Sequence, residues 1–225
     1  MTSVGLVTGS EPFAGLPDNP AELLLPRIDG RSFGSIEVKA VSTPVSLAGL
    51  PTFLPALIAE YRPAFVVSLG LATGEAVLRV EAIGINMLSF GVADNDGAQP
   101  TDGRALDPSG PPARKATWDC DAIVRALLAA GLPAKTSYSA GTHMCNATLY
   151  TALGAMEALG LKGPCGFFHV PYLPQQVARF LAEVPVGGNR APQAERALAS
   201  MSFDDQLRGV SIMLETVARS ATSGR

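Results

Sequence analysis

The stretch AFVVSL, residues 64–69, lies between Pro63 and Gly70 and predicts a short strand that is buried on both faces. Outward from it, runs rich in Val and Ile alternate with helical patterns along the chain. This alternation is typical of βα units around a largely buried sheet. The chain has 225 residues, a usual size for one domain, so we expect a single α/β domain spanning 1–225.

The same patterns predict the other elements. Further strands are expected at 4–8, 35–42, 77–88, 134–139 and 166–170. Helices are expected from the cap at Asn19 to 25, at 47–61 with shortening or kinking by its prolines, at 120–130, at 145–159, and from a capping box at 202–205 to about 218. Residues 186–191 are predicted to form a loop. The stretch 90–118 is dense in Gly, Pro and Asp and is too long for a simple connection, which indicates a functional loop or lid.

Composition narrows the classes of partner. The net charge is −3, and the scattered Lys and Arg form no basic stripe of the kind that binds phosphates or anionic lipids. No apolar run reaches the roughly eighteen residues of a membrane helix, and the first residues do not resemble a secretory signal. We therefore expect neither nucleic acid nor a membrane as partner.

The cysteines and histidines are few. Cys120, Cys145 and Cys165 are an odd number in a chain of this size, so we expect reduced thiols in a cytoplasm. Their spacing fits no zinc pattern, and the two histidines, His143 and His169, form no HExxH motif. We expect no metal site.

The segment SAGTHMCNATLY, residues 139–150, points to a nucleophile. Small, turn-prone residues follow a predicted strand and precede a helical pattern, which places Cys145 near a helix N-terminus. Free backbone amides and the helix dipole favour a thiolate there, and the same amides can donate to an oxyanion. The alternative is that Cys145 is a small buried hydrophobic residue, as many free cysteines are.

A thiol nucleophile usually needs a histidine as base. His169 closes the predicted strand at 166–170, and the carboxyl ends of strands face the crevice where α/β enzymes usually work. His143 lies two residues before Cys145, where side chains generally diverge, so it is the weaker candidate and could instead line the pocket. A core histidine bound to a backbone carbonyl is the alternative interpretation of His169.

The base also needs an acceptor that orients its ring. Glu81 stands in a mostly apolar, extended stretch where a lone carboxylate would be costly to bury. A salt bridge to Arg79 or exposure on an edge strand would also explain it. Asp94 and Asp102, in the stretch 90–118, compete for the same role.

Four blocks occur in a specific order and spacing. They are VTGSEPFAG (7–15) with Asn19 and Pro20, EAIGIN (81–86) leading to Asp94 and Asn95, SAGTHMCN (139–146) and FHVPYLP (168–174). Together they resemble the pyroglutamyl peptidases, or pyrrolidone carboxyl peptidases, a family of cytosolic cysteine peptidases. The resemblance implies a single-domain α/β/α sandwich with a mixed, largely parallel central sheet. It also implies that Cys145 is the nucleophile, His169 the base and Glu81 the orienting acid.

The resemblance further implies an activity and a set of partners. Family members are omega peptidases that remove an N-terminal pyroglutamate from peptides through an acyl-enzyme, without metal or organic cofactor, and often assemble as homodimers or homotetramers. Recognition of a flat lactam calls for aromatic or apolar walls and a few hydrogen bonds. By likeness, Phe13 is a pocket phenylalanine and Asn19 an asparagine near the substrate backbone.

Several positions depart from the family pattern. Ser10 and His143 each replace an aromatic residue, Met144 replaces a valine, and Leu71 replaces a glutamine. Glu75 and Gly91 each stand where an arginine is usual. Loss of a hydrogen-bonding group can change specificity by orders of magnitude without touching the acyl-transfer machinery. Two alternatives therefore remain: a thiol amidohydrolase for another small acyl or cyclic amide group, and a catalytically silent binding protein of the same fold.

Overall fold

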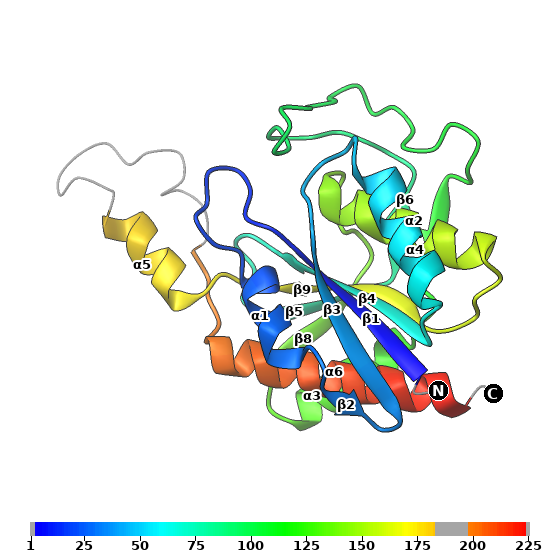
Figure 1. Ribbon diagram of the computed structural model, residues 1–225. Helices are drawn as coiled ribbons and strands as arrows, with labels where there is room; N and C mark the ends of the chain where they lie inside the picture. Colours follow the sequence, from blue (N-terminus) through cyan, green and yellow to red (C-terminus); the bar gives the residue numbers. More distant parts are fainter. Residues whose placement is uncertain (1–2, 183–197, 224–225) are drawn as a thin grey trace.

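The computed structural model describes residues 3–182 and 198–223. Its central feature is a seven-stranded sheet in the order β2-β3-β1-β4-β9-β5-β8 (Figure 1). The strands are β1 (Ser3–Ser10), β2 (Ser32–Phe33), β3 (Ile36–Thr43), β4 (Phe65–Leu71), β5 (Leu78–Glu81), β8 (Ala134–Ser137) and β9 (Cys165–Val170). β2 runs antiparallel to β3 and β5 runs antiparallel to β9, whereas the other pairs are parallel. A separate antiparallel pair joins β6 (Ile83–Ile85) and β7 (Ala113–Lys115).

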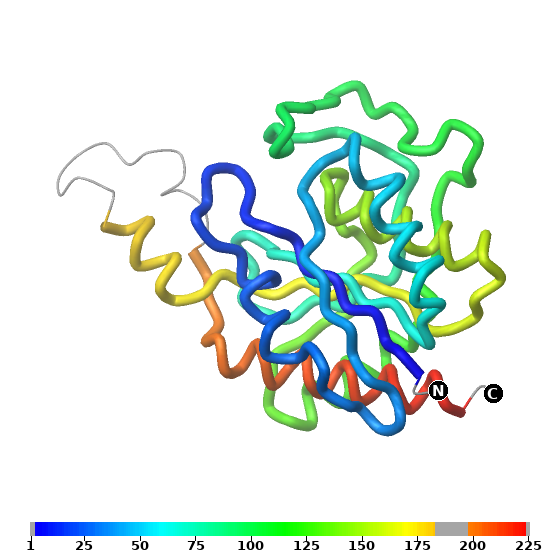
Figure 2. Tube along the Cα trace, viewed as in Figure 1, coloured from blue at the N-terminus to red at the C-terminus, as the bar shows by residue number. Residues whose placement is uncertain are grey.

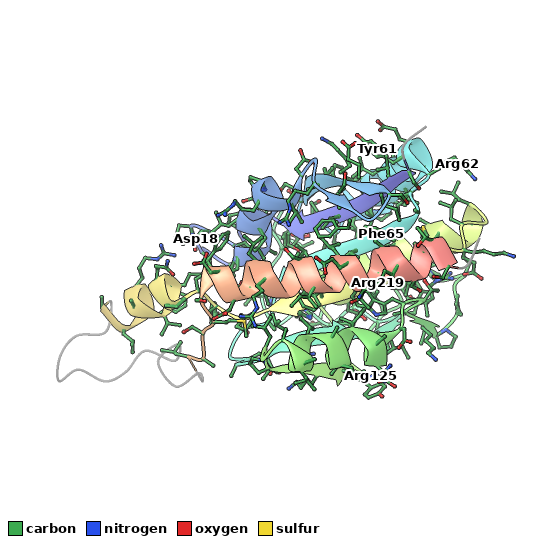
Figure 3. The ribbon with its side chains drawn as sticks, turned by 90° about the horizontal axis from the view of Figure 1, so that it is seen from below. Asp18, Tyr61, Arg62, Phe65, Arg125 and Arg219 are labelled. Carbon is green, nitrogen blue, oxygen red and sulfur yellow. The ribbon has the colours of Figure 1, made fainter. Side chains whose placement is uncertain are left out.

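Helices cover both faces of the sheet. α1 (Pro20–Ile28), α3 (Cys120–Ala129) and α6 (Phe203–Ser223) pack on one face, where α6 lies between the other two (Figure 3). α2 (Leu50–Tyr61) and α4 (Met144–Ala158) pack together on the opposite face. α5 (Pro174–Ala182) projects from the body of the molecule (Figure 1). The predicted α/β/α arrangement with a mixed, largely parallel sheet is confirmed.

Each face of the sheet has its own hydrophobic core. Alternate residues of a strand point to opposite faces. In β4, Phe65, Val67 and Leu69 therefore join the core beneath α1, α3 and α6, whereas Val66 joins the core beneath α2 and α4. All seven residues of β4 are buried, as expected for the central strand. The same alternation decides which side chains of the neighbouring strands face α4.

Some elements differ from the sequence prediction. The extended stretch 77–88 forms two strands in different sheets, because the chain changes hydrogen-bond partners at Ala82, whose amide binds Ser137 while its carbonyl binds Ala116. α2 begins at Leu50 rather than at 47, with Pro51 in its first turn, where proline is favoured. Pro55 lies inside the helix, which continues past it to Tyr61. The capping box at Ser202 is present, but α6 continues to Ser223. Strand β2 and helix α5 were not predicted, and the predicted loop at 186–191 lies outside the described residues.

The predicted loop at 90–118 is largely irregular, with β7 as its one strand. Its first part arches above α2 and α4 in the view of Figure 2. The Asn95 amide donates to Glu11 Oε1 at 2.8 Å and to the Pro12 carbonyl at 2.9 Å. Asp94 accepts hydrogen bonds from the amides of Leu47, Asp96 and Ala98. These contacts tie the loop to the segments after β1 and before α2.

Candidate active site

His169 lies near the carboxyl end of β9, between β4 and β5. Because Phe168 and Val170 point into the core under α6, Phe167 and His169 point to the face covered by α4. The two rings on this face, those of Phe167 and His169, have centroids 4.7 Å apart. The imidazole is 5% exposed, so its polar atoms depend on protein partners.

Glu81 provides one of these partners. In the antiparallel pairing of β5 with β9, Glu81 lies opposite Phe167 and diagonally across from His169, on the same face of the sheet. Its Oε1 lies 2.8 Å from His169 Nδ1, and the carboxylate is completely buried. The contact fixes the Nδ1 position of the ring as the hydrogen-bond donor and leaves Nε2 for another partner.

Arg79 binds the same carboxylate oxygen. Its Nη2 lies 3.0 Å from Glu81 Oε1 and also donates to Ser137 Oγ and the Ser139 carbonyl. The sequence left three explanations for Glu81: an orienting contact with a histidine, a salt bridge to Arg79, or exposure on an edge strand. Exposure is wrong, because the side chain is completely buried and β5 lies between β9 and β8. In the structure both contacts meet at one oxygen.

Cys145 is the second residue of α4, which begins at Met144 after the cap residue His143. The first amides of an α-helix have no intrahelical acceptors, and the His143 side chain does not cap them. Cys145 forms a side-chain hydrogen bond with His169. Burial lowers the pKa of His169, but Cys145 and Glu81 outweigh this effect and raise it to about 9. The raised pKa means that His169 is protonated at neutral pH.

Gly70 makes room for this arrangement. It pairs with His169 in the parallel register of β4 and β9. A Cβ atom at this position would lie 2.6 Å from the Phe167 ring and 3.2 Å from Cys145 Sγ. A side chain here would therefore push on both the ring beside His169 and the sulfur.

The other two thiols have different surroundings. Cys165 is fully buried on β9, and burial raises its pKa to about 12. Burial also raises the pKa of Cys120, at the start of α3. Neither contacts a histidine through any recorded hydrogen bond or ring contact in the described part of the chain. Cys145 is thus the cysteine that the fold brings to an imidazole.

The rival acids lie elsewhere. Asp94 uses both carboxylate oxygens for backbone amides of its own loop and of the segment before α2. Asp102 accepts from the amide of Arg104 and is exposed. His143, the rival base, lies 3.0 Å through its Nε2 from the Val92 carbonyl, which links it to the 90–118 loop.

Four of the six residues proposed for substrate contact fall into two groups. Phe13 and His143 form a ring stack with centroids 5.9 Å apart, and Phe90 adds a third ring 4.1 Å from His143. Ser10 and Leu71 lie at the carboxyl ends of the adjacent parallel strands β1 and β4, near the end of β9 that holds His169.

The other two, Asn19 and Met144, are buried, as is Leu71. Asn19 Oδ1 caps α1 by accepting from the Ala21 amide, and its Nδ2 donates to the Glu11 carbonyl. This bond holds the segment that leads to Phe13. Met144 packs into the core beneath α2 and α4. Both side chains therefore support the site from within the protein.

Sequence reasoning missed three contributors: Gly70, Phe90 and the double role of Arg79. Local patterns reveal neither Gly70, which meets His169 through the pairing of β4 with β9, nor Phe90, which meets His143 through the path of the irregular segment after β6. The charge of Arg79 beside Glu81 was a visible signal.

In residues 3–182 and 198–223, no group of three or more His, Cys, Asp or Glu side chains is arranged to hold a metal ion. Within the same ranges, no helix has the length and apolar character needed to cross a membrane.

The chain has clear relatives. A family model for pyroglutamyl peptidase matches residues 4–220. A pyrrolidone-carboxylate peptidase of Cupriavidus pinatubonensis is 37% identical over 211 residues, which are 91% of this chain and 88% of the relative. The solved structure of pyrrolidone carboxyl peptidase from Thermococcus litoralis has a TM-score of 0.88 at 30% identity and covers 99% of this chain and 96% of that one. A mutant of the Pyrococcus furiosus pyrrolidone carboxyl peptidase reaches 0.88 at 29% identity, covering 97% and 99%.

Proposed function

Because this chain belongs to the pyroglutamyl peptidase family, we propose that it is a cysteine peptidase that removes N-terminal pyroglutamate from peptides. In this proposal Cys145 is the nucleophile, His169 the general acid and base, and Glu81 the group that orients His169. One observation carries the assignment. The buried His169 ring lies 2.8 Å from Glu81 through Nδ1 and also contacts Cys145.

The reaction begins with attack by the Cys145 sulfur on the carbonyl carbon of the pyroglutamyl group. A carbon–sulfur bond forms and the carbonyl oxygen takes the negative charge. The uncapped amides at the start of α4 are suitably located to donate to this oxyanion.

Collapse of this intermediate breaks the carbon–nitrogen bond. His169, protonated before the attack, gives its Nε2 proton to the leaving amine, so the shortened peptide departs with a neutral amino group. The neutral imidazole then takes a proton from water, which attacks the thioester and releases pyroglutamate. Glu81 accepts from Nδ1 in both steps and so keeps the Nε2 atom directed at the reacting groups.

Recognition of the lactam would rely on Phe13 and His143, whose stacked rings can offer an apolar face. A hydrogen bond to the Val92 carbonyl holds His143 in place. The segment that carries Phe13 is held by hydrogen bonds from Asn19 to the Glu11 carbonyl and from Asn95 to the Pro12 carbonyl. We propose that His143 compensates for the missing aromatic at Ser10. The alternative remains an amidohydrolase for a different small acyl group, and the departures at Leu71 and Gly91, for which no replacement is proposed, favour it.

We extend the proposal to the setting of the enzyme. The partners would be N-terminally blocked peptides, with no nucleic acid or membrane, which the net charge of −3 supports. A cytoplasmic location is supported by the free state of all three cysteines. One domain over 1–225 and assembly as a homodimer or homotetramer complete the proposal.

A chromogenic pyroglutamyl amide tests the function directly. We expect turnover by the wild-type protein and none above background with Cys145→Ala. A parallel panel of prolyl, acetyl and other cyclic amides measures kcat/KM for each group. If the wild type prefers another amide and loses this activity in Cys145→Ala, the proposed substrate is wrong but the proposed mechanism stands. Full turnover by Cys145→Ala would overturn both, and an inert wild-type protein with unreactive Cys145 would indicate a binding protein.

A further inference from the structure

Arg79 stands in a line of alternating charges that leads from the surface to the candidate nucleophile. Lys135, half exposed on β8, lies 3.0 Å from Glu75, and Glu75 lies 3.2 Å from Arg79 Nη1. Arg79 Nη2 then lies 3.0 Å from Glu81 Oε1, which also binds His169. The line ends at Cys145, which contacts His169.

Glu81 needs a permanent cation as neighbour. Its carboxylate is completely buried, and its Oε2 atom has no hydrogen-bond partner in the described structure. An unpaired buried carboxylate is costly and tends to take up a proton instead. His169 can serve as the cation only while it is protonated. In the reaction proposed above, His169 is neutral from the departure of the amine until water attacks.

The contacts of Arg79 fit this requirement. Its guanidinium cannot lose a proton at any working pH. Besides Glu81 it holds Ser137 Oγ at 2.7 Å and the Ser139 carbonyl, at the start of the turn that leads to Cys145. The charged and titratable groups around His169 are thus Glu81 and Arg79 on β5 and Cys145 on α4, with Glu75 and Lys135 one step further out.

We propose that Arg79 is a positioning residue that remains the cationic partner of the buried Glu81 carboxylate when His169 is neutral, and thereby lets His169 give up and regain its proton in each cycle. The inference rests on the proposed function for its place in the cycle. Since Arg79 also repels a proton on His169, its removal should make His169 hold its proton more tightly. Proton transfer to the leaving amine would then be slower, although substrate binding would be unchanged.

The test compares Arg79→Met with a matched control. Arg114 is as buried as Arg79, with 16% against 18% of the side chain exposed, and it also pairs with a glutamate, Glu157, so Arg114→Met reports the general effect of losing such an ion pair. For Arg79→Met we expect kcat to fall about tenfold or more, with KM within about threefold of wild type. Arg114→Met should leave both nearly unchanged.

A second readout needs no turnover. The rate of alkylation of Cys145 by iodoacetamide, followed by peptide mass spectrometry over a range of pH, should show an inflection where His169 loses its proton. We expect Arg79→Met to move this inflection upward by about one pH unit. Arg79→Lys keeps the charge and should leave the inflection in place, with kcat within about fivefold of wild type.

An unmoved inflection in folded Arg79→Met, or an equal shift in Arg114→Met, would overturn the inference. If Arg79→Met does not fold, Arg79→Lys decides: an unmoved inflection with near-normal kcat supports the inference, and a tenfold loss of kcat in a folded protein overturns it. Because alkylation is independent of substrate, a wild type that fails to cleave pyroglutamyl amides would refute the proposed function alone.

Discussion

Replacing Glu81 by glutamine changes one charge in the buried contact with His169 and nothing in its size. The Nδ1–Oε1 bond of 2.8 Å is charge-assisted when the ring is protonated. A hydrogen bond to a charged group contributes about 1.5–3 kcal/mol, and each 1.36 kcal/mol corresponds to a tenfold change in rate. We therefore expect Glu81→Gln to lower kcat by about 10- to 150-fold.

The same substitution should change the pH dependence in a defined direction. Glu81 is among the groups that raise the pKa of His169 to about 9. Without its charge the pKa of His169 falls, so the alkaline limb of kcat/KM should move to lower pH. Arg79 also loses a partner but keeps Glu75, Ser137 and Ser139, and stability should fall by about 2 kcal/mol.

Steady-state kinetics with a pyroglutamyl amide over a range of pH measure both effects, and urea denaturation measures stability. Glu157→Gln is the control, since Glu157 also pairs with an arginine but is 73% exposed. It should match wild type in all three measurements. The reasoning about Glu81 is refuted if folded Glu81→Gln keeps kcat within threefold of wild type and shows no movement of the alkaline limb.

Three further predictions follow from the same geometry. The pKa of His169 is raised from 6.5 to about 9, so its ion pair stabilises the fold fully below about pH 6.5, and this contribution is lost as pH rises through about 9. The difference in free energy of unfolding between wild type and His169→Asn should therefore shrink as pH rises over this range. A difference that grows with pH would contradict the assignment. Gly70→Ala forces a Cβ to within 2.6 Å of the Phe167 ring, so we expect about 1–3 kcal/mol of destabilisation and at least tenfold lower kcat, whereas Gly91→Ala, with no atom within 4 Å of its Cβ, should be neutral in thermal unfolding. Phe13→Ala should raise KM about tenfold or more with kcat largely kept, and a loss confined to kcat would show that Phe13 does not bind substrate.

Most elements around the proposed triad could be predicted because their signals are local. About ten residues of sequence are enough to identify each of three features: the run of small residues before α4, the buried stretch of β4 and the strand that ends near His169. The capping box at Ser202 was equally plain. What the local patterns could not decide was whether Glu81 would contact His169, Arg79 or both.

That choice depends on strand order. Glu81 meets His169 because β5 runs antiparallel beside β9, a pairing between residues 88 positions apart. Long-range pairing of this kind leaves no local trace, and the same is true of Gly70 opposite His169. α5 was missed although its sequence is amphipathic; the helix is short, and only Gln176 in it is buried. The sequence likewise did not show that Asn19 and Met144 are buried, because burial depends on which way their side chains point in the folded protein.

The central claim is that the Cys145 sulfur attacks the pyroglutamyl carbonyl with His169 as its proton carrier. The most direct measurement is to mix enzyme with a pyroglutamyl ester, quench with acid within the first turnover and map the modified peptide by mass spectrometry. The account predicts one pyroglutamyl group on Cys145 in wild type, and its absence from His169→Asn at the same time point. Acylation of Cys120 or Cys165 instead, or release of product by Cys145→Ala at the wild-type rate, would contradict it.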